Sequence, residues 1–198
     1  MEKSITFKEL SQRWLSVSSL GKTYTYQQNL QSYINHLNNG IGECKVSDVK
    51  PAHIDEIIRQ LYIENPNTKK PTSKKVLKNI VDCATRIFDY AIENELIYKN
   101  PARNKKKVIP KNAPTKIVSA ITPEQQQLVI DTEHRAKIAA VIMMFMGLRT
   151  GEVLALEWGD IDLVNYKLSV NKRTQRISSN KYLSLIHISE PTRPISIS

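Results

Sequence analysis

The chain has 198 residues, which is enough for one or two domains with hydrophobic cores. It lacks any run of the roughly 18 apolar residues that a membrane-spanning helix needs, and residues 1–20 mix charged and apolar side chains in a way that is not typical of a signal peptide, so we expect a cytoplasmic protein. The formal net charge of +10 favours a polyanionic partner, either nucleic acid or an anionic membrane surface.

The first hundred residues predict a small bundle of amphipathic helices. Apolar residues recur at helical spacing in four stretches, residues 5–16, 23–37, 51–61 and 72–94. The second stretch is followed by Asn38-Asn39-Gly40, a helix stop signal, and Pro51 lies where the third helix begins. Four such helices with short connections form a bundle. We expect its aromatic residues, including Trp14 and Tyr33, to lie in the core rather than to stack on nucleic-acid bases.

Basic residues are concentrated in two segments that contain no carboxylate, residues 68–78 and 99–116. Such concentrated charge fits contact with phosphate groups better than a uniformly solvated surface does. The candidate DNA-binding residues of these two segments are Lys69, Lys70, Lys74, Lys75, Lys78, Arg103, Lys105, Lys106, Lys107 and Lys111.

Residues 100–118 change character from the helical region before them. Pro101, Pro110 and Pro114 stand among basic residues, and little periodicity is present. Proline limits helix formation and like charges keep a chain extended, so this stretch predicts a basic linker. It is either a flexible tether or a basic arm that lies along DNA.

A second domain is predicted to begin with a helix whose N-cap is Thr122 and whose first turn contains Pro123. The next helix, residues 135–146, is so apolar that we expect it to be largely buried. A third helix begins near Thr150, and alternating polar and apolar residues at 166–170 predict an edge strand. Three helices followed by a strand indicate the opening of an α+β domain.

The junction Gly147-Leu148-Arg149-Thr150-Gly151-Glu152 is the candidate catalytic segment. One helix ends at Gly147 and another begins within about three residues, so Arg149 leaves a tight junction. A guanidinium held in this way is planar, permanently charged and able to bind a phosphate through two hydrogen bonds. Glu152 lies in the first turn of the new helix, where a carboxylate suits the helix dipole, and could brace Arg149 from behind. An arbitrary Gly-Leu-Arg tripeptide usually marks a solvated loop. The choice between such a loop and a phosphate-binding site therefore depends on the longer sequence around Arg149.

Cys44 and Cys83 are the only cysteines, and no CxxC motif or cysteine–histidine cluster is present. Two isolated thiols make neither a disulfide framework nor a metal site. We therefore expect buried, inert thiols and no metal.

Residues 146–162 read MGLRTGEVLALEWGDID, and this stretch resembles the segment around the first active-site arginine of the tyrosine recombinases, the phage integrase family. The preceding helices and basic linker are similar in organisation to integrases of phages and conjugative transposons. The resemblance implies a mainly α fold: an N-terminal four-helix, SAM-like core-binding domain at residues 1–99, a basic linker at 100–118, and the opening helices and first strand of an α+β catalytic domain at 119–182.

The same resemblance implies a mechanism. A tyrosine attacks the scissile phosphate, forms a 3′-phosphotyrosyl bond and releases a 5′-hydroxyl, while arginines, a lysine and histidine or tryptophan side chains bind and protonate the phosphoryl group. No metal or nucleotide cofactor takes part. By position, Arg149 corresponds to the first arginine and Glu152 to the acidic residue beside it. The implied partner is double-stranded DNA at attachment sites, bound by a homotetramer of the full-length protein.

The rest of the family's site has no clear counterpart. Lys172 and Lys181 lie in the approach to the hairpin that carries the catalytic lysine, but neither has a matching local motif, and no His-x-x-Arg motif occurs. All eight tyrosines precede the second domain or come early in it. Residues 183–193, LSLIHISEPTR, resemble a translated sequencing adapter. We therefore expect residues 183–198 to be a non-native tail, and the chain to be an N-terminal fragment that lacks the nucleophile.

Three functions remain open at this point. The first is a recombinase that integrates or excises a mobile element. The second is a catalytically inactive DNA-binding module or integrase remnant, and the third is an RNA-binding or membrane-surface protein. The basic segments fit the first two, and the third has charge in its favour but no motif. Only the segment around Arg149 favours the enzyme.

Overall fold

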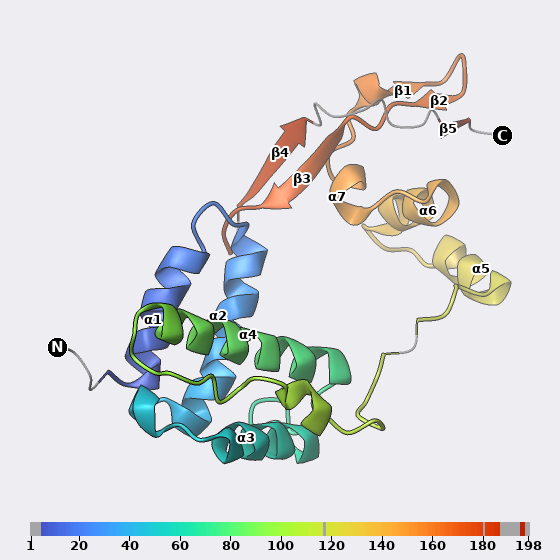
Figure 1. The fold of residues 1–198 in the computed structure, drawn as a ribbon. Helices are drawn as coiled ribbons and strands as arrows, with labels where there is room; N and C mark the ends of the chain where they lie inside the picture. Colours follow the sequence, from blue (N-terminus) through green and yellow to red (C-terminus); the bar gives the residue numbers. More distant parts are fainter. Residues whose placement is uncertain (1–4, 117, 180, 187–194, 197–198) are drawn as a thin grey trace. The chain divides into compact units, whose positions relative to one another are not determined.

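A computed structural model describes residues 5–116, 118–179, 181–186 and 195–196 (Figure 1). The chain divides into two compact units, Met1–Ile117 and Val118–Ser198. The fold is mainly α, as the sequence predicts.

Unit 1 contains the four predicted helices, namely α1 (Phe7–Ser18), α2 (Tyr24–Ile41), α3 (Pro51–Ile63) and α4 (Lys74–Glu93), with the short 3₁₀ turns η1 (Val46–Asp48) and η2 (Lys105–Val108). Helix α1 starts in a capping box in which Thr6 and Glu9 exchange hydrogen bonds. Helix α2 runs past the predicted stop signal to Ile41. Gly40 lies within this helix and against α3, where a Cβ atom would meet Ile57 Cγ1 at 2.6 Å, so glycine permits the close approach of the two helices.

The core of unit 1 lies between these helices. The rings of Phe7 of α1 and Phe88 of α4 pack at 5.3 Å between centroids, tilted by 38°, and both are fully buried. Trp14 is also buried, as predicted, while Tyr33 is half-buried at the edge and accepts a hydrogen bond from Asn79.

Of the two thiols, Cys83 is buried, and burial raises the pKa of its thiol to about 12. The thiolate that would react is therefore disfavoured at neutral pH. The expectation of a buried thiol is wrong for Cys44, which is only partly buried.

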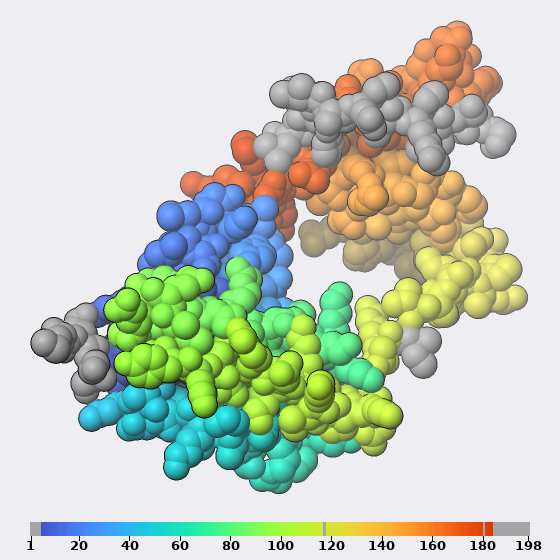
Figure 2. All heavy atoms as spheres, in the orientation of Figure 1, coloured from blue at the N-terminus to red at the C-terminus, as the bar shows by residue number. Residues whose placement is uncertain are grey.

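The segment that we predicted to be an extended linker is instead folded onto unit 1 over most of its length. Ala102, Ile109 and Ala113 are buried in the same core as the helices. In Figure 2 this yellow-green segment lies over the face of unit 1. The like charges do not keep it extended, because apolar residues among them are buried in the core and carboxylates of unit 1 pair with three of the cations.

Unit 2 opens with α5 (Pro123–Asp131), α6 (Lys137–Met146) and α7 (Thr150–Val153), followed by η3 (Trp158–Asp160). Thr122 caps α5 in a capping box with Gln125, as the sequence predicts for this helix start. The strands are β1 (Ile161–Asp162), β2 (Lys167–Leu168), β3 (Lys172–Arg176), β4 (Tyr182–Ile186) and β5 (Ile195–Ser196).

These strands form two antiparallel sheets, one in the order β1-β2-β5 and one in which β3 pairs with β4. The predicted strand at 166–170 is shorter than expected and lies between two others rather than at an edge. Tyr166 takes a positive φ of 51° and belongs to the turn before β2. Of the tail that we expect to be non-native, residues 187–194, 197 and 198 lie outside the described residues.

The expectation that α6 is largely buried is wrong for the part of the chain that the structure describes. None of its residues is buried there, and Phe145 remains 63% exposed. Its main neighbours are the short helices α5 and α7, which cover only part of its surface. Composition predicts burial only where other elements pack around a helix. No described helix is long and apolar enough to cross a membrane.

Candidate active-site arginine and nucleic-acid interface

The backbone around Gly147 sets the position of Arg149. Helix α6 ends at Met146, and Gly147 takes a left-handed φ of 65° while its N–H donates to the Met143 carbonyl at 3.1 Å. A residue with a Cβ atom is strained in this conformation. Leu148 is buried and anchors the turn, so that Arg149 emerges as the N-cap of α7.

Glu152 holds both ends of Arg149. The Arg149 N–H donates to Glu152 Oε2 at 2.8 Å, and Arg149 Nη1 donates to Glu152 Oε1 at 3.0 Å. The Arg149 side chain is 87% exposed, whereas that of Glu152 is 17% exposed. The carboxylate thus fixes the backbone of the junction and one edge of the guanidinium, and most of the guanidinium faces solvent.

An arginine in this position can bind an oxyanion. Its planar group offers five N–H donors, so a contact to one carboxylate leaves enough of them for a bidentate grip on phosphate. Because Glu152 orients the group beforehand, less rotational freedom is lost when an anion binds.

Helix α7 is seated on strand β3. A Cβ atom at Gly151 would lie 2.9 Å from the Thr174 carbonyl oxygen, so only glycine lets α7 come this close to β3. At the beginning of β3, Lys172 Nζ contacts Glu157 Oε2 at 2.7 Å and Asp160 Oδ2 at 3.5 Å. The hydrogen bond to Glu157 is the main cause that raises the pKa of Lys172.

These contacts bear on the two lysines considered for catalysis. The amine of Lys172 ties β3 to η3, and contact with a phosphate would require that tie to break. Lys181 is exposed in the turn between β3 and β4, where its carbonyl accepts from the Ile177 N–H at 3.0 Å. A catalytic role for Lys181 stays a prediction.

The first basic segment presents its lysines from a loop and a helix start. The buried side chain of Asn65 donates to Thr72 Oγ1 at 3.1 Å, and its backbone pairs with Lys69 and Lys70. The lysines at 69 and 70 are exposed on this loop. Sequence reasoning missed Asn65, although the Asn-Pro dipeptide that it begins is a turn signal.

The lysines of α4 divide into two kinds. Lys75 and Lys78 are exposed and lie three residues apart, on one side of the helix. Lys74 instead donates from Nζ to the Lys111 carbonyl at 3.0 Å. It therefore fastens the later basic segment to the helix.

The second basic segment is largely neutralised by carboxylates of unit 1. Lys105 Nζ lies 2.7 Å from Asp55 Oδ2 of α3, and the Lys105 side chain is only 16% exposed. On α4, Asp82 pairs with Lys106, and Asp89 lies 3.7 Å from Arg103.

Two further cations of this segment, Lys107 and Lys111, are exposed without a carboxylate partner among the described residues. Sequence reasoning missed the pairing carboxylates of α3 and α4. The seven-residue spacing of Asp82 and Asp89 was a signal for the two on α4, since it places both on one face of that helix.

Comparisons with known proteins agree with this geometry. Residues 7–108 match the family described as phage integrase central domain. The tyrosine recombinase XerC-like protein of Caldanaerobacter subterraneus subsp. tengcongensis is 27% identical over 184 residues, covering 89% of this chain and 46% of the relative. The chain thus spans just under half the length of that relative.

Solved structures share the fold. The Tn1549 transposon integrase, in complex with transposon right end DNA, superposes with a TM-score of 0.76 at 19% identity, covering 98% of this chain and 61% of that one. A lambda integrase tetramer bound to a Holliday junction superposes with a TM-score of 0.66 at 18% identity, covering 93% of this chain and 52% of the other. The fold is thus that of the DNA-bound integrases.

The family assignment is more specific than the fold. The match to the phage integrase central domain covers about half of the sequence and nearly all of the folded part of unit 1. The chain belongs to the phage integrase family of tyrosine recombinases.

Proposed function

We propose that this chain is part of a site-specific DNA recombinase that breaks and rejoins DNA through a 3′-phosphotyrosine intermediate, for integration or excision of a mobile element. In this proposal Arg149 binds the scissile phosphate and Glu152 orients Arg149. The observation that carries it is the junction before α7, where Glu152 holds the backbone and one edge of a guanidinium that is otherwise exposed.

The proposed reaction conserves the phosphodiester energy. A tyrosine oxygen attacks phosphorus, the bond to the 5′-oxygen breaks, and that oxygen leaves as a hydroxyl after taking up a proton. Negative charge builds up on the non-bridging oxygens in the transition state, and a pre-oriented guanidinium stabilises it there. Arg149 would supply part of this stabilisation.

We propose that the nucleophile and the second arginine belong to a longer form of the protein. Two features support this: the chain spans 46% of its XerC-like relative, and the sequence has no His-x-x-Arg motif. We also propose that the longer protein acts on attachment sites in the cytoplasm as a homotetramer. The tetrameric lambda integrase of similar fold supports that assembly.

The contacts divide the predicted DNA-binding residues into two groups. We propose that phosphates are bound by the exposed group that forms no ion pair within the described part of the chain, Lys69, Lys70, Lys75, Lys78, Lys107 and Lys111. The other group, Lys74, Arg103, Lys105 and Lys106, is engaged with carbonyl or carboxylate oxygens of unit 1 and holds the fold together.

The experiment that tests the role of Arg149 separates binding from chemistry. In the 198-residue chain, we expect Arg149→Ala to leave the Kd for duplex DNA within about twofold, since unit 1 supplies the charge that attracts DNA. In the protein encoded by the complete source gene, the same substitution should abolish the covalent complex with a nicked suicide duplex. Arg149→Lys, which keeps the charge without the bidentate geometry, should restore little of it.

Two results would count against the proposal. Equal loss of binding and of cleavage would make Arg149 a structural residue. Sequencing of the source locus beyond the codon for Tyr182 is the second check. A reading frame that stops there, without a distal tyrosine, would leave a DNA-binding module in place of the enzyme.

A further inference from the structure

We infer that residues 100–113 form a strap that folds across α3 and α4 and thereby keeps the connection between the two units short, with the Lys105–Asp55 ion pair as its central pin. The strap is defined by three kinds of contact: a polar lock at its beginning, ion pairs along its length, and a fastening at its end. Asp89 of α4 takes part in both the lock and the ion pairs.

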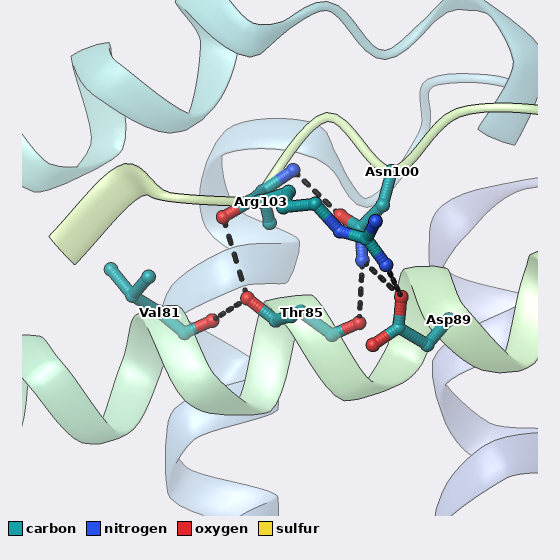
Figure 3. A network of polar contacts seen from close by, with 6 residues as sticks. Val81, Thr85, Asp89, Asn100 and Arg103 are labelled. Carbon is teal, nitrogen blue, oxygen red and sulfur yellow. Dashed lines mark hydrogen bonds and ion pairs between the residues drawn. The ribbon is translucent and has the colours of Figure 1, made fainter.

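The lock at the beginning is the side chain of Asn100 (Figure 3). Its amide nitrogen donates to the Thr85 carbonyl at 2.9 Å and to Asp89 Oδ1 at 2.7 Å, and its oxygen accepts from the Ala102 N–H at 2.8 Å. Thr85 Oγ1 in turn donates to the Ala102 carbonyl at 3.3 Å. One asparagine therefore ties the strap to the carboxyl-terminal half of α4 and turns the chain back along that helix.

The ion pairs bind the strap to two helices at once. On α4, Asp89 forms an ion pair with Arg103 and Asp82 forms one with Lys106. Asp55 of α3 forms an ion pair with Lys105. The Lys105 side chain is the least exposed of the three cations. A pair that is largely screened from water is weakened less by salt than an exposed pair, so we identify this one as the pin.

The end of the strap is fastened at the other end of α4. The Lys74 N–H donates to the Pro114 carbonyl at 2.8 Å, and Lys74 Nζ donates to the Lys111 carbonyl at 3.0 Å. Ile109 and Ala113 are buried beside these contacts. The segment is thus held at both ends and in the middle, unlike a tether.

The consequence is a limit on how far unit 2 can move from unit 1. Between Pro114 and the N-cap Thr122 about seven residues remain, which span at most roughly 25–30 Å. With the strap released, about 22 residues would connect the units and could span roughly 75 Å. Effective concentration falls steeply as a flexible linker lengthens. If the proposed function holds, the strap keeps Arg149 close to the DNA that unit 1 binds.

Hydrogen exchange on the 198-residue chain tests the strap without DNA or activity. We expect amides of residues 102–113 to be protected, and Asp55→Asn to speed their exchange by about tenfold or more while those of α2 change little. Asp48→Asn, a change in an exposed carboxylate outside the strap contacts, is the matched control and should alter neither. Wild-type exchange at the rate of an unstructured chain, or equal acceleration in α2 and in the strap, would overturn the inference.

The reach itself is measured by spin labels on two exposed glutamines, one in each unit, in Gln28→Cys/Gln127→Cys with Cys44→Ser. We expect Asp55→Asn/Asp82→Asn to broaden the distance distribution towards longer values at an unchanged α-helix content. An unchanged distribution, in a variant whose strap exchanges faster, would show that the strap does not set the reach. These readouts do not depend on recombination, so they can fail while the proposed function stands.

Discussion

The two basic segments of unit 1 look alike in composition and differ in what their charges do. In residues 68–78 the lysines at 69, 70, 75 and 78 are exposed. The buried side chain of Asn65 holds the loop through a hydrogen bond to Thr72. In residues 100–113 three cations face carboxylates, and Asn100 locks the segment to α4. We therefore expect a lysine of either segment to bind phosphate only where the fold supplies no carboxylate partner for it.

The largest effect should follow removal of the exposed lysines of the first segment. We expect the quadruple change of Lys69, Lys70, Lys75 and Lys78 to Gln to weaken duplex DNA binding more than tenfold at low salt, because each phosphate contact releases counterions. The slope of log K against log salt should become shallower by about 3 to 4. Fluorescence anisotropy over a salt series measures both quantities. Unchanged affinity, with the fold intact by circular dichroism, would move the interface elsewhere.

A second effect should appear in stability rather than in binding. Lys105→Met removes the partner of Asp55, whose Oδ1 is already buried without a hydrogen-bond partner among the described residues. We expect the free energy of unfolding to fall by about 1–2 kcal/mol in urea denaturation. Lys107→Met, two residues away and exposed, is the control and should change stability by less than about 0.5 kcal/mol. An equal loss of stability in Lys105→Met and Lys107→Met would show that the ion pair of Lys105 stabilises the fold no more than an exposed lysine does.

A smaller effect is expected for the asparagine that supports the first segment. Asn65→Ala removes a buried hydrogen bond to Thr72 and loosens the loop that carries Lys69 and Lys70. We expect a loss of about 1 kcal/mol in stability and a two- to threefold weaker Kd for DNA. If DNA affinity stayed unchanged while stability fell, the loop would have no part in binding.

The smallest effect concerns the exposed ion pair of Glu56 and Arg59, which lies within α3 and, among the described residues, connects no other element to it. Hydrogen bonds from Arg59 and Gln60 lower the pKa of Glu56 to about 2. A carboxyl group whose pKa is lower in the folded chain stabilises the fold at pH values above its unfolded pKa of about 4.5. That contribution is lost as the pH falls from about 4.5 to about 2. The stability difference between the native chain and Glu56→Gln should therefore shrink between pH 5 and pH 2.5. A difference that is constant over this range would contradict the assignment.

Much of the fold and part of the candidate site follow from local sequence. Helix periodicity and caps predicted α1 to α5, and the Gly147–Glu152 stretch predicted a turn with Arg149 at its exit. These features depend on residues within a few positions of each other.

The parts that were missed depend on distant residues. The strap needs Asp55, which is 50 residues from Lys105 in sequence. A count of charges within one segment cannot reveal a carboxylate partner that comes from a distant part of the sequence. The exposure of α6 likewise depends on which elements pack against it. Apolar composition alone predicted the opposite.

Two single substitutions, compared in one assay, test whether the exposed lysines of unit 1 contribute free charge to DNA while the lysines paired with carboxylates do not. Lys75→Gln and Lys106→Gln each remove one positive charge from the surface of unit 1. We expect Lys75→Gln to lower the salt slope of DNA binding by about 1 and Lys106→Gln to leave it unchanged. Equal reductions in slope would show that the paired lysine also binds phosphate and would contradict the division into exposed and paired lysines.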